Sequence, residues 1–366
     1  MPMRWACLLA ALGLPLLAAC SDEAATARGA VIPPPPPLPW AAEAMPAPPE
    51  PADNPGTPAK IALGRVLFYD PVLSSDGTVA CATCHSEVWG MSDGLPRSIG
   101  VGGKGPTGPG RVGPTATRRN AQTLWNVAYR GALFWDGRAA TLEEQALAPL
   151  HQARELGRDP AALVAQLGQI PAYLALFEAA FPDASPAVSV PHLARALAAF
   201  ERTLVSDEAS YDHYVRGDAG ALSETSKRGM FLFAEAGCAG CHAPPTFDGP
   251  GYADRRVPPT PGLDDPRDPG RQGVTHEAAD HDAFRVPTLR NVRETGPYFH
   301  TGAVATLEEA VRHEAGLASR ALDDEEIHAL TTFLDKGLVD PSRSPSRPAQ
   351  VPSGLPVPLD GFRIPR

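Results

Sequence analysis

Several features are scarce in the sequence, and each shortage excludes a kind of partner or structure. Positive charge is in deficit, because 32 lysines and arginines stand against 42 acids and leave a net charge of −10. This argues against nucleic acid as a partner and suits a basic protein partner. Long apolar runs are missing, since the one from Trp5 to Ala19 is shorter than the roughly 20 residues of a membrane-spanning helix. No segment alternates polar and apolar residues clearly enough to predict a strand.

Export is predicted from the first residues. Arg4 and the apolar run behind it are typical of a signal peptide, which we place at residues 1–19. Its end, Leu17-Ala18-Ala19-Cys20, resembles the bacterial lipobox, in which the cysteine after the cleavage site receives acyl chains. The alternative is an ordinary signal peptide that happens to end before a cysteine. On the first interpretation Cys20 carries a lipid anchor. Ser21, in place of the aspartate that retains such proteins on the inner membrane, predicts the periplasmic side of the outer membrane.

Cysteine is scarce as well, with six in the chain. Cys7 would leave with the signal peptide and Cys20 would take the lipid. The other four form two Cys-x-x-Cys-His motifs, and none remains for a disulfide. The motifs are Cys81, Cys84 and His85, and Cys238, Cys241 and His242.

Each motif meets the requirement for covalent attachment of a c-type haem, which is two thiols on one turn and an adjacent imidazole that reaches the iron from the same side. A four-thiolate zinc site and a thiol redox motif are the alternatives. Neither accounts for the histidine after each cysteine pair. We therefore predict two covalently bound haem c groups, with His85 and His242 as the proximal ligands of the iron atoms.

Proline-rich ends frame the part that is predicted to fold. Residues 20–57 include five consecutive prolines, Pro33 to Pro37, and are predicted to be a tether, while residues 339–366 are predicted to be a tail along the surface. Between them, short motifs recur in one constant register. These are Gly64-x-x-Leu67-Phe68 and Gly229-x-x-Leu232-Phe233, Thr123-Leu124-x-Asn126-Val127 and Thr288-Leu289-x-Asn291-Val292, and Thr141-Leu142-Glu143-Glu144 and Thr306-Leu307-Glu308-Glu309.

The repeat predicts an all-α protein of two cytochrome c-like helical domains related by internal duplication, residues 58–220 and 221–338, each with one covalent haem. Thr141 and Thr306, each with a glutamate three places on, predict capping boxes that start helices. Apolar residues at helical spacing predict further helices over residues 60–68, 193–204, 227–234 and 324–334.

Further segments make the sequence resemble a known family. They are Phe134-Trp135-Asp136-Gly137-Arg138-Ala139, Phe284-Arg285-Val286-Pro287-Thr288-Leu289-Arg290-Asn291-Val292 and Pro297-Tyr298-Phe299-His300. Together with the two haem motifs, they resemble the bacterial diheme cytochrome c peroxidases, including the MauG-like relatives that mature a tryptophylquinone cofactor. The resemblance covers about residues 58–338.

The resemblance implies a division of labour between the two domains. The N-terminal domain would hold the peroxidatic haem, with Gln145 and Glu155 at its open face and Glu155 as the acid/base that moves a proton between the peroxide oxygens. The C-terminal domain would be the electron-transfer domain, and Trp135 would relay electrons between the haems. A calcium ion would be bound by Asn120, Thr295 and Pro297.

Two positions depart from the family pattern. Val101 stands where many members carry a displaceable distal histidine, so the first iron is predicted to be open in every redox state unless His151 takes that place. For the second iron, the family's distal position falls on Glu314, and His313 stands beside it. Imidazole is the better iron ligand, which slightly favours His313, and both candidates stay open. Either ligand would lower the reduction potential relative to methionine.

The function predicted first is reduction of hydrogen peroxide to water in the periplasm, with electrons from a small periplasmic donor such as a cytochrome c or a cupredoxin. A second is a MauG-like oxidation of tryptophan or tyrosine residues in a partner protein. A third, a diheme electron-transfer cytochrome, would need both irons closed by protein ligands. The lipid anchor would bring the chain to a membrane, and a second copy of the chain is a candidate partner in a homodimer.

Overall fold

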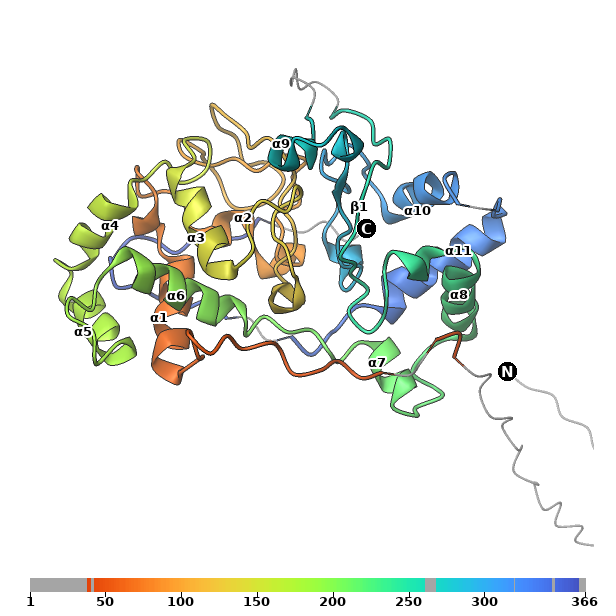
Figure 1. Cartoon of the computed structure of the whole chain (residues 1–366), viewed down its shortest axis with the longest axis horizontal. Helices are drawn as coiled ribbons and strands as arrows, with labels where there is room; N and C mark the ends of the chain where they lie inside the picture. Colours follow the sequence, from red (N-terminus) through yellow and green to blue (C-terminus); the bar gives the residue numbers. More distant parts are fainter. Residues whose placement is uncertain (1–37, 41–42, 261–267, 319, 344–345, 362–366) are drawn as a thin grey trace, which may run out of the picture. The chain divides into compact units, whose positions relative to one another are not determined.

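The computed structural model describes residues 38–40, 43–260, 268–318, 320–343 and 346–361, and from Leu38 onward the chain forms one compact unit (Figure 1). The predicted signal peptide, Cys20 and the first part of the predicted tether lie outside the described residues. Residues 58–220 are called the first half below, and residues 221–338 the second half. The boundary between them stays a prediction.

Helices dominate both halves, as the sequence predicted. The first half contains α1 (Pro58–Tyr69), α2 (Cys81–Cys84), α3 (Leu142–His151), α4 (Pro160–Leu167), α5 (Pro171–Ala180), α6 (Val190–Glu201) and α7 (Ser210–Val215). The second half contains α8 (Glu224–Glu235), α9 (Gln272–Thr275), α10 (Leu307–Ala315) and α11 (Asp324–Thr332), which continues into a π-helical turn at Phe333–Gly337. Short 3-10 turns lie at Pro71–Leu73, Glu87–Trp89, Val127–Tyr129, Cys238–Gly240, Ala278–Asp280 and Val292–Glu294.

One small sheet was not predicted. The two-residue strands β1 (Tyr252–Ala253) and β2 (Phe284–Arg285) pair antiparallel, with Tyr252 opposite Arg285. They are too short to show the alternation on which a sequence-based strand prediction depends.

The same helix contact occurs in each half. In the first half α1 packs on α6 so closely that a Cβ atom on Gly64 would lie 1.9 Å from the carbonyl oxygen of Ala196. In the second half α8 packs on α11, and a Cβ atom on Gly229 would lie 2.0 Å from the carbonyl oxygen of Ala329. Glycine is needed at both positions because any side chain would meet the backbone of the facing helix.

Local backbone structure also matches between the halves. The Thr141 hydroxyl accepts a hydrogen bond from the Glu144 amide at 3.2 Å and starts α3, and Thr306 caps α10 through the Glu309 amide at the same distance. Both predicted helix starts are therefore confirmed, but the full capping box forms only at Thr306, since the Glu144 carboxylate accepts from the Ala140 amide in place of the Thr141 amide. Asn126 and Asn291 both have a φ of 59°, the left-handed conformation that asparagine tolerates.

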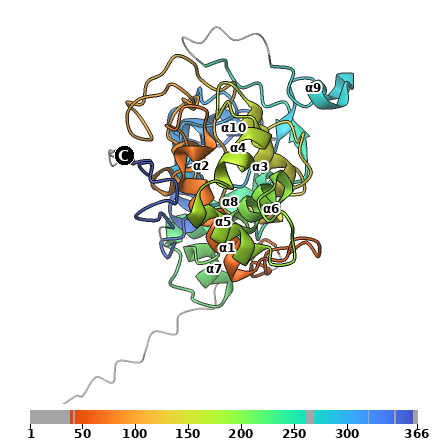
Figure 2. The same cartoon turned by 90° about the vertical axis from the view of Figure 1, so that its left-hand side faces the viewer.

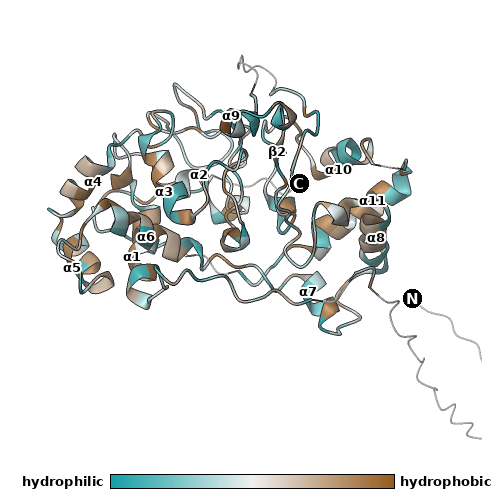
Figure 3. Cartoon of the chain, in the orientation of Figure 1, coloured by the Kyte–Doolittle hydropathy of each residue, from teal (hydrophilic) through white to brown (hydrophobic). Residues whose placement is uncertain are grey.

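Two hydrophobic clusters form the core. The first gathers around α1, α5 and α6, and the second around α8 and α11; α1 and α3–α6 lie together, as Figure 2 shows from the side. In Figure 3, α4 and α5 are coloured mostly as hydrophobic, whereas α11 begins with acidic residues. No single helix among the described residues is long and apolar enough to cross a membrane. Taken together, α4 and α5 have the required length and apolar composition, but the chain bends by 101° between them.

The two ends of the described chain pack on opposite halves. Before the first half, the ring of Trp40 packs edge-on against Phe233 and Phe247 of the second half, and its indole N–H donates to the hydroxyl of Tyr211 in α7 at 2.8 Å. After the second half, the Ser353 hydroxyl donates to Asp70 at 2.6 Å, and Val351 packs in the first cluster. Part of the predicted tether thus has fixed contacts, and the described part of the tail lies along the first half.

Candidate functional site

The first cysteine pair lies on the single turn of α2, and His85 follows as its C-terminal cap. The Nδ1 atom of His85 lies 3.0 Å from the carbonyl oxygen of Met91. Since a carbonyl can only accept, Nδ1 carries the hydrogen and the Nε2 lone pair remains available. Burial lowers the pKa of His85, which keeps the ring neutral. A neutral imidazole fixed through one nitrogen is the form that ligates iron.

The second motif repeats this arrangement. Cys238 begins a 3-10 turn that ends at Gly240, and Cys241 follows as its C-terminal cap. The Nδ1 atom of His242 lies 2.9 Å from the carbonyl oxygen of Pro287. Burial lowers the pKa of His242 as well. Among the described residues, which include all four motif cysteines, no three His, Cys, Asp or Glu side chains form a metal-binding group, so the four-thiolate zinc alternative gains no support.

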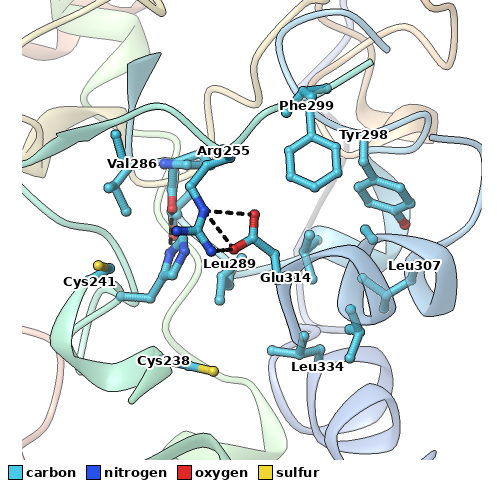
Figure 4. Close-up of a pocket in the computed structure, with 18 of the residues that line it drawn as sticks. Cys238, Cys241, Arg255, Val286, Leu289, Tyr298, Phe299, Leu307, Glu314 and Leu334 are labelled. Atoms are coloured by element: carbon cyan, nitrogen blue, oxygen red, sulfur yellow. Dashed lines mark hydrogen bonds and ion pairs between the residues drawn. The ribbon is translucent and has the colours of Figure 1, made fainter. Parts of the chain in front are cut away.

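A cavity of about 460 Å³ opens beside the second motif (Figure 4). This size lies within the range of cofactor sites in proteins, roughly 300–1,000 Å³. Cys238, Cys241 and His242 line one side of it. Its other walls are largely apolar and include Phe233, Val286, Leu289, Tyr298, Leu307 and Leu334. Two thiols, an available imidazole nitrogen and apolar walls in one cavity fit a covalently bound haem.

One ion pair stands in this apolar cavity. The Nε atom of Arg255 lies 2.9 Å from Oε2 of Glu314, and both residues line the cavity (Figure 4). The neighbouring His313 is not among the lining residues, and its Nε2 atom lies 2.7 Å from the carbonyl oxygen of Arg255. Of the two predicted distal ligands, Glu314 therefore faces the cavity. Arg255 was missed, because it comes from an irregular loop that no motif marks.

Near the first haem motif, the acid is Glu155, and among the described residues it forms no ion pair. Glu155 follows α3, and burial raises the pKa of its carboxyl, against the effect of nearby Arg138. Its charge also acts on the thiols of Cys81 and Cys84, which places it close to the first haem motif. Gln145 is half-buried on α3.

The loop that contains Val101 rests on the backbone of Glu155. The Val101 amide donates to the Glu155 carbonyl oxygen at 3.0 Å, and a Cβ atom on Gly100 would lie 2.2 Å from the carbonyl oxygen of Arg154. His151, the predicted substitute ligand, is exposed at the end of α3. Val101, where the family resemblance would place a histidine, is therefore held next to the backbone of Glu155.

Trp135 belongs to the first half and contacts the second. Its indole N–H donates to the carbonyl oxygen of Asn120 at 2.9 Å, and its ring centroid lies 6.2 Å from that of His300. Trp135 lines the cavity of the second motif together with the three predicted calcium ligands, Asn120, Thr295 and Pro297. The amide nitrogen of Asn120 donates to the carbonyl oxygen of Leu95 at 2.8 Å, so the amide oxygen is the atom that would bind a cation.

A buried acid at the end of α6 was not predicted. Glu201 is 5% exposed, its Oε2 atom has no hydrogen-bond partner, and burial raises its pKa to about 8. Its charge acts on the thiol of Cys81. Phe200 packs against Gly64 in the first half, and Phe333 packs against Gly229 in the same way in the second. The residue after Phe200 is Glu201, and the residue after Phe333 is Leu334. Since Leu334 lines the second cavity, Glu201 holds the equivalent place beside the first motif.

The comparisons with known proteins agree with this geometry. A family model described as di-haem cytochrome c peroxidase matches residues 58–220. The chain is 39% identical to the methylamine utilization protein MauG of Methylorubrum extorquens over 72% of this chain and 71% of that protein. The chain belongs to the di-haem cytochrome c peroxidase family. Membership implies two c-type haems and the activity class of a peroxidase, an oxidoreductase.

Other similar proteins include both peroxidases and a MauG-like protein. The cytochrome c551 peroxidase of Pseudomonas aeruginosa is 38% identical over 68% of this chain and 69% of that protein. Among solved structures, a MauG-like protein associated with microbial copper homeostasis has a TM-score of 0.72 and 31% identity, covering 83% of this chain and 96% of that one. The diheme peroxidase BthA of Burkholderia thailandensis, with a TM-score of 0.65 and 22% identity over 84% of this chain and 92% of that one, shares the fold.

Proposed function

We propose that this chain reduces hydrogen peroxide to water in the periplasm, at a haem held by Cys81, Cys84 and His85. The overall reaction takes two electrons and two protons for each peroxide and yields two waters. The observation that carries the proposal is the contrast between the two sites. Among the described residues, the acid beside the first motif, Glu155, has no ion-pair partner, and burial raises its pKa, whereas Glu314 in the second cavity is paired with Arg255.

When bound, the first haem supplies the redox-active iron to which peroxide binds. The role proposed for Glu155 is to take the proton from one peroxide oxygen and deliver it to the other, which leaves as water. A carboxyl whose pKa is raised toward neutral exchanges protons more readily at the working pH than an ordinary glutamate does. Gln145 would orient the peroxide from α3, because its amide can both donate and accept.

Electrons would enter at the second haem, held by Cys238, Cys241 and His242, from a small cytochrome c or cupredoxin. The acidic chain, with its net charge of −10, supports a basic donor. Trp135 would pass the electrons on, since its ring lines the second cavity while its indole N–H is held by the backbone of Asn120 in the first half.

For the distal position of the second haem, we favour Glu314 over His313. Glu314 lines the cavity and is held there by its ion pair with Arg255, whereas His313 is not among the lining residues. We expect Glu314→Gln to change the ferric spectrum and the reduction potential of one haem only. His313→Gln should leave both haems unchanged. The reverse result in a spectroelectrochemical titration would return the role to His313.

Several features of the whole protein are part of the proposal. They are the lipid anchor on Cys20, the outer-membrane location, two haem domains that arose by duplication, a calcium ion at Asn120, Thr295 and Pro297, and a homodimer. The duplication is supported by the shared helix contact and helix caps, and the calcium site by the shared cavity of its three residues. Calcium removal by a chelator should alter the spectrum of the second haem, because the three residues line its cavity.

A second function is favoured by one comparison. The similarity to the MauG-like protein associated with copper homeostasis, and the absence of methionine at the family's distal position, support oxidation of tryptophan or tyrosine residues in a partner protein. The two functions differ in what is consumed, because one needs a reduced donor and the other a protein substrate.

One set of measurements tests the proposal. Intact mass should show two haem additions that survive acid-acetone extraction, and the ferric spectrum should contain a high-spin component that responds to peroxide. Steady-state turnover should then consume peroxide with a reduced cytochrome c or cupredoxin as donor. Two low-spin haems whose ferric spectrum does not change when peroxide is added would indicate an electron carrier. A response to peroxide without donor-dependent turnover would favour oxidation of a partner protein.

A further inference from the structure

Two buried arginines, one from each half, share a single acid. The Nε atom of Arg130 lies 3.2 Å from Oδ2 of Asp248, and the Nη1 atom of Arg285 lies 2.9 Å from Oδ1 of the same residue. Both arginine side chains are 3% exposed. Two guanidinium groups against one carboxylate leave an excess positive charge inside the protein, and such a charge is costly unless an anion joins it.

Several N–H groups of this cluster have no hydrogen-bond partner in the described part of the chain. They are Nη2 of Arg130, Nε and Nη2 of Arg285, and the side-chain amide nitrogen of Gln122, all buried. A buried donor without an acceptor costs about 1–3 kcal/mol, and more when it is charged. Arg130, Arg285 and Gln122 all line the cavity of the second motif, so the unused donors and the excess charge belong to one cavity.

We propose that Arg130, Arg285 and Gln122 form a carboxylate-binding site that holds the propionates of the second haem. A haem attached through its vinyl groups to Cys238 and Cys241 carries its two propionates on the edge away from these thioethers. Guanidinium groups bind carboxylates through paired N–H donors, and the amide of Gln122 adds a further donor. A free carboxylate would match the same donors, which makes the source of the anion part of the test.

The site joins the two halves through the cofactor. Gln122 and Arg130 come from the first half, whereas Arg285 and the cysteines come from the second. Burial and the neighbouring Arg285 lower the pKa of Arg130 to about 10, so the guanidinium is still charged at neutral pH. A fixed positive charge beside the haem favours the reduced iron, which has one positive charge less. Arg130 would therefore be a positioning residue that also raises the potential of the second haem.

The test uses the holoprotein with both haems, whose presence is first checked by intact mass. It depends on the proposed haem at Cys238, Cys241 and His242 and not on peroxide turnover. Arg130→Gln and Arg285→Gln should each lower the reduction potential of one haem and make that potential depend on pH near neutrality, because the propionates lose the charge that keeps them ionised. The propionate bending mode in the resonance Raman spectrum should shift. Arg130→Lys should keep most of the potential but still shift that mode.

Arg343→Gln is the matched control. The Arg343 side chain is 12% exposed, has one buried N–H group without a partner among the described residues, and pairs with Glu294 at 2.8 Å, but it does not line the cavity. Potentials in Arg130→Gln and Arg285→Gln that move no further than in this control would overturn the proposal. If the glutamine variants fail to fold, an unshifted Raman mode in Arg130→Lys would overturn it.

Acetate distinguishes the two sources of the carboxylate. The spectrum and potentials of the wild type should not change when acetate is added, because the propionates already fill the site. A wild-type response to acetate that disappears in Arg130→Gln would show that a free carboxylate occupies the site and would contradict the propionate assignment.

Discussion

The two halves share a scaffold and differ in the acids around it. Both close a helix pair over a glycine, fix a histidine through a backbone carbonyl, and start a helix with a capping threonine. Beside the first motif, Glu155 and Glu201 are buried acids with raised pKa values. In the second, Leu334 takes the place of Glu201, and Glu314 is paired with Arg255. On the proposed function, the acids of the first half would exchange protons at its cofactor, whereas the acid of the second cavity, Glu314, is held in an ion pair with Arg255.

The sharpest test of this contrast removes the acid of the first half. Glu155→Gln should retain both haems but lower peroxide turnover at saturating donor by about a hundredfold or more, the usual loss when a general acid/base is removed. Glu178→Gln, on the exposed face of α5, is the matched control and should be fully active. Unchanged turnover in Glu155→Gln would mean that the two halves do not differ in proton transfer.

The shared scaffold can be tested in both halves at once. Gly64→Ala and Gly229→Ala should each lower the free energy of unfolding by about 1–3 kcal/mol, because the added methyl group meets backbone and not a movable side chain. Denaturant unfolding of the holoprotein would measure this loss. Gly168→Ala, where the nearest atom would be 3.5 Å away, should be neutral or stabilising. A large loss in one half only would contradict a common packing arrangement.

Substitution of Val101 can test whether the first iron lacks a distal protein ligand. Wild-type ferric protein should react with peroxide without prior reduction, since an aliphatic residue lies beside Glu155. Val101→His should slow this reaction by on the order of tenfold unless the protein is first half-reduced, because the imidazole can ligate the iron. Val101→Ile controls for size, and rapid mixing measures the rate. An inert wild type would mean that another ligand closes the first iron.

The smallest effect concerns Glu201 and pH. A carboxyl whose pKa is about 8 in the folded protein and near 4.5 when unfolded binds its proton more tightly in the folded state. Stability from this group is present below pH 4.5 and is lost as pH rises toward 8. Glu201→Gln should therefore stabilise the protein by about 1 kcal/mol or more at pH 9 and not at pH 4. Equal changes in melting temperature at both pH values would contradict the assignment of this pKa to Glu201.

The sequence predicted best what is encoded locally. The haem motifs, the helix-starting threonines and the repeated glycines are defined by neighbouring residues, and the helices and caps among them are confirmed. The strands β1 and β2, the pairing of Arg255 with Glu314, and the cluster of Arg130, Arg285 and Asp248 were not predicted. Each joins residues from separate irregular segments, where no periodicity tells which side chains will meet.

The contacts of the two chain ends predict what happens when the chain is cleaved between the halves. The ring of Trp40, which precedes the first half, packs on Phe233 and Phe247 of the second half. Val351 and Ser353, which follow the second half, are anchored on the first. A single cut after residue 220 would thus leave each fragment with an arm that belongs on the other. The two fragments should therefore stay associated after cleavage.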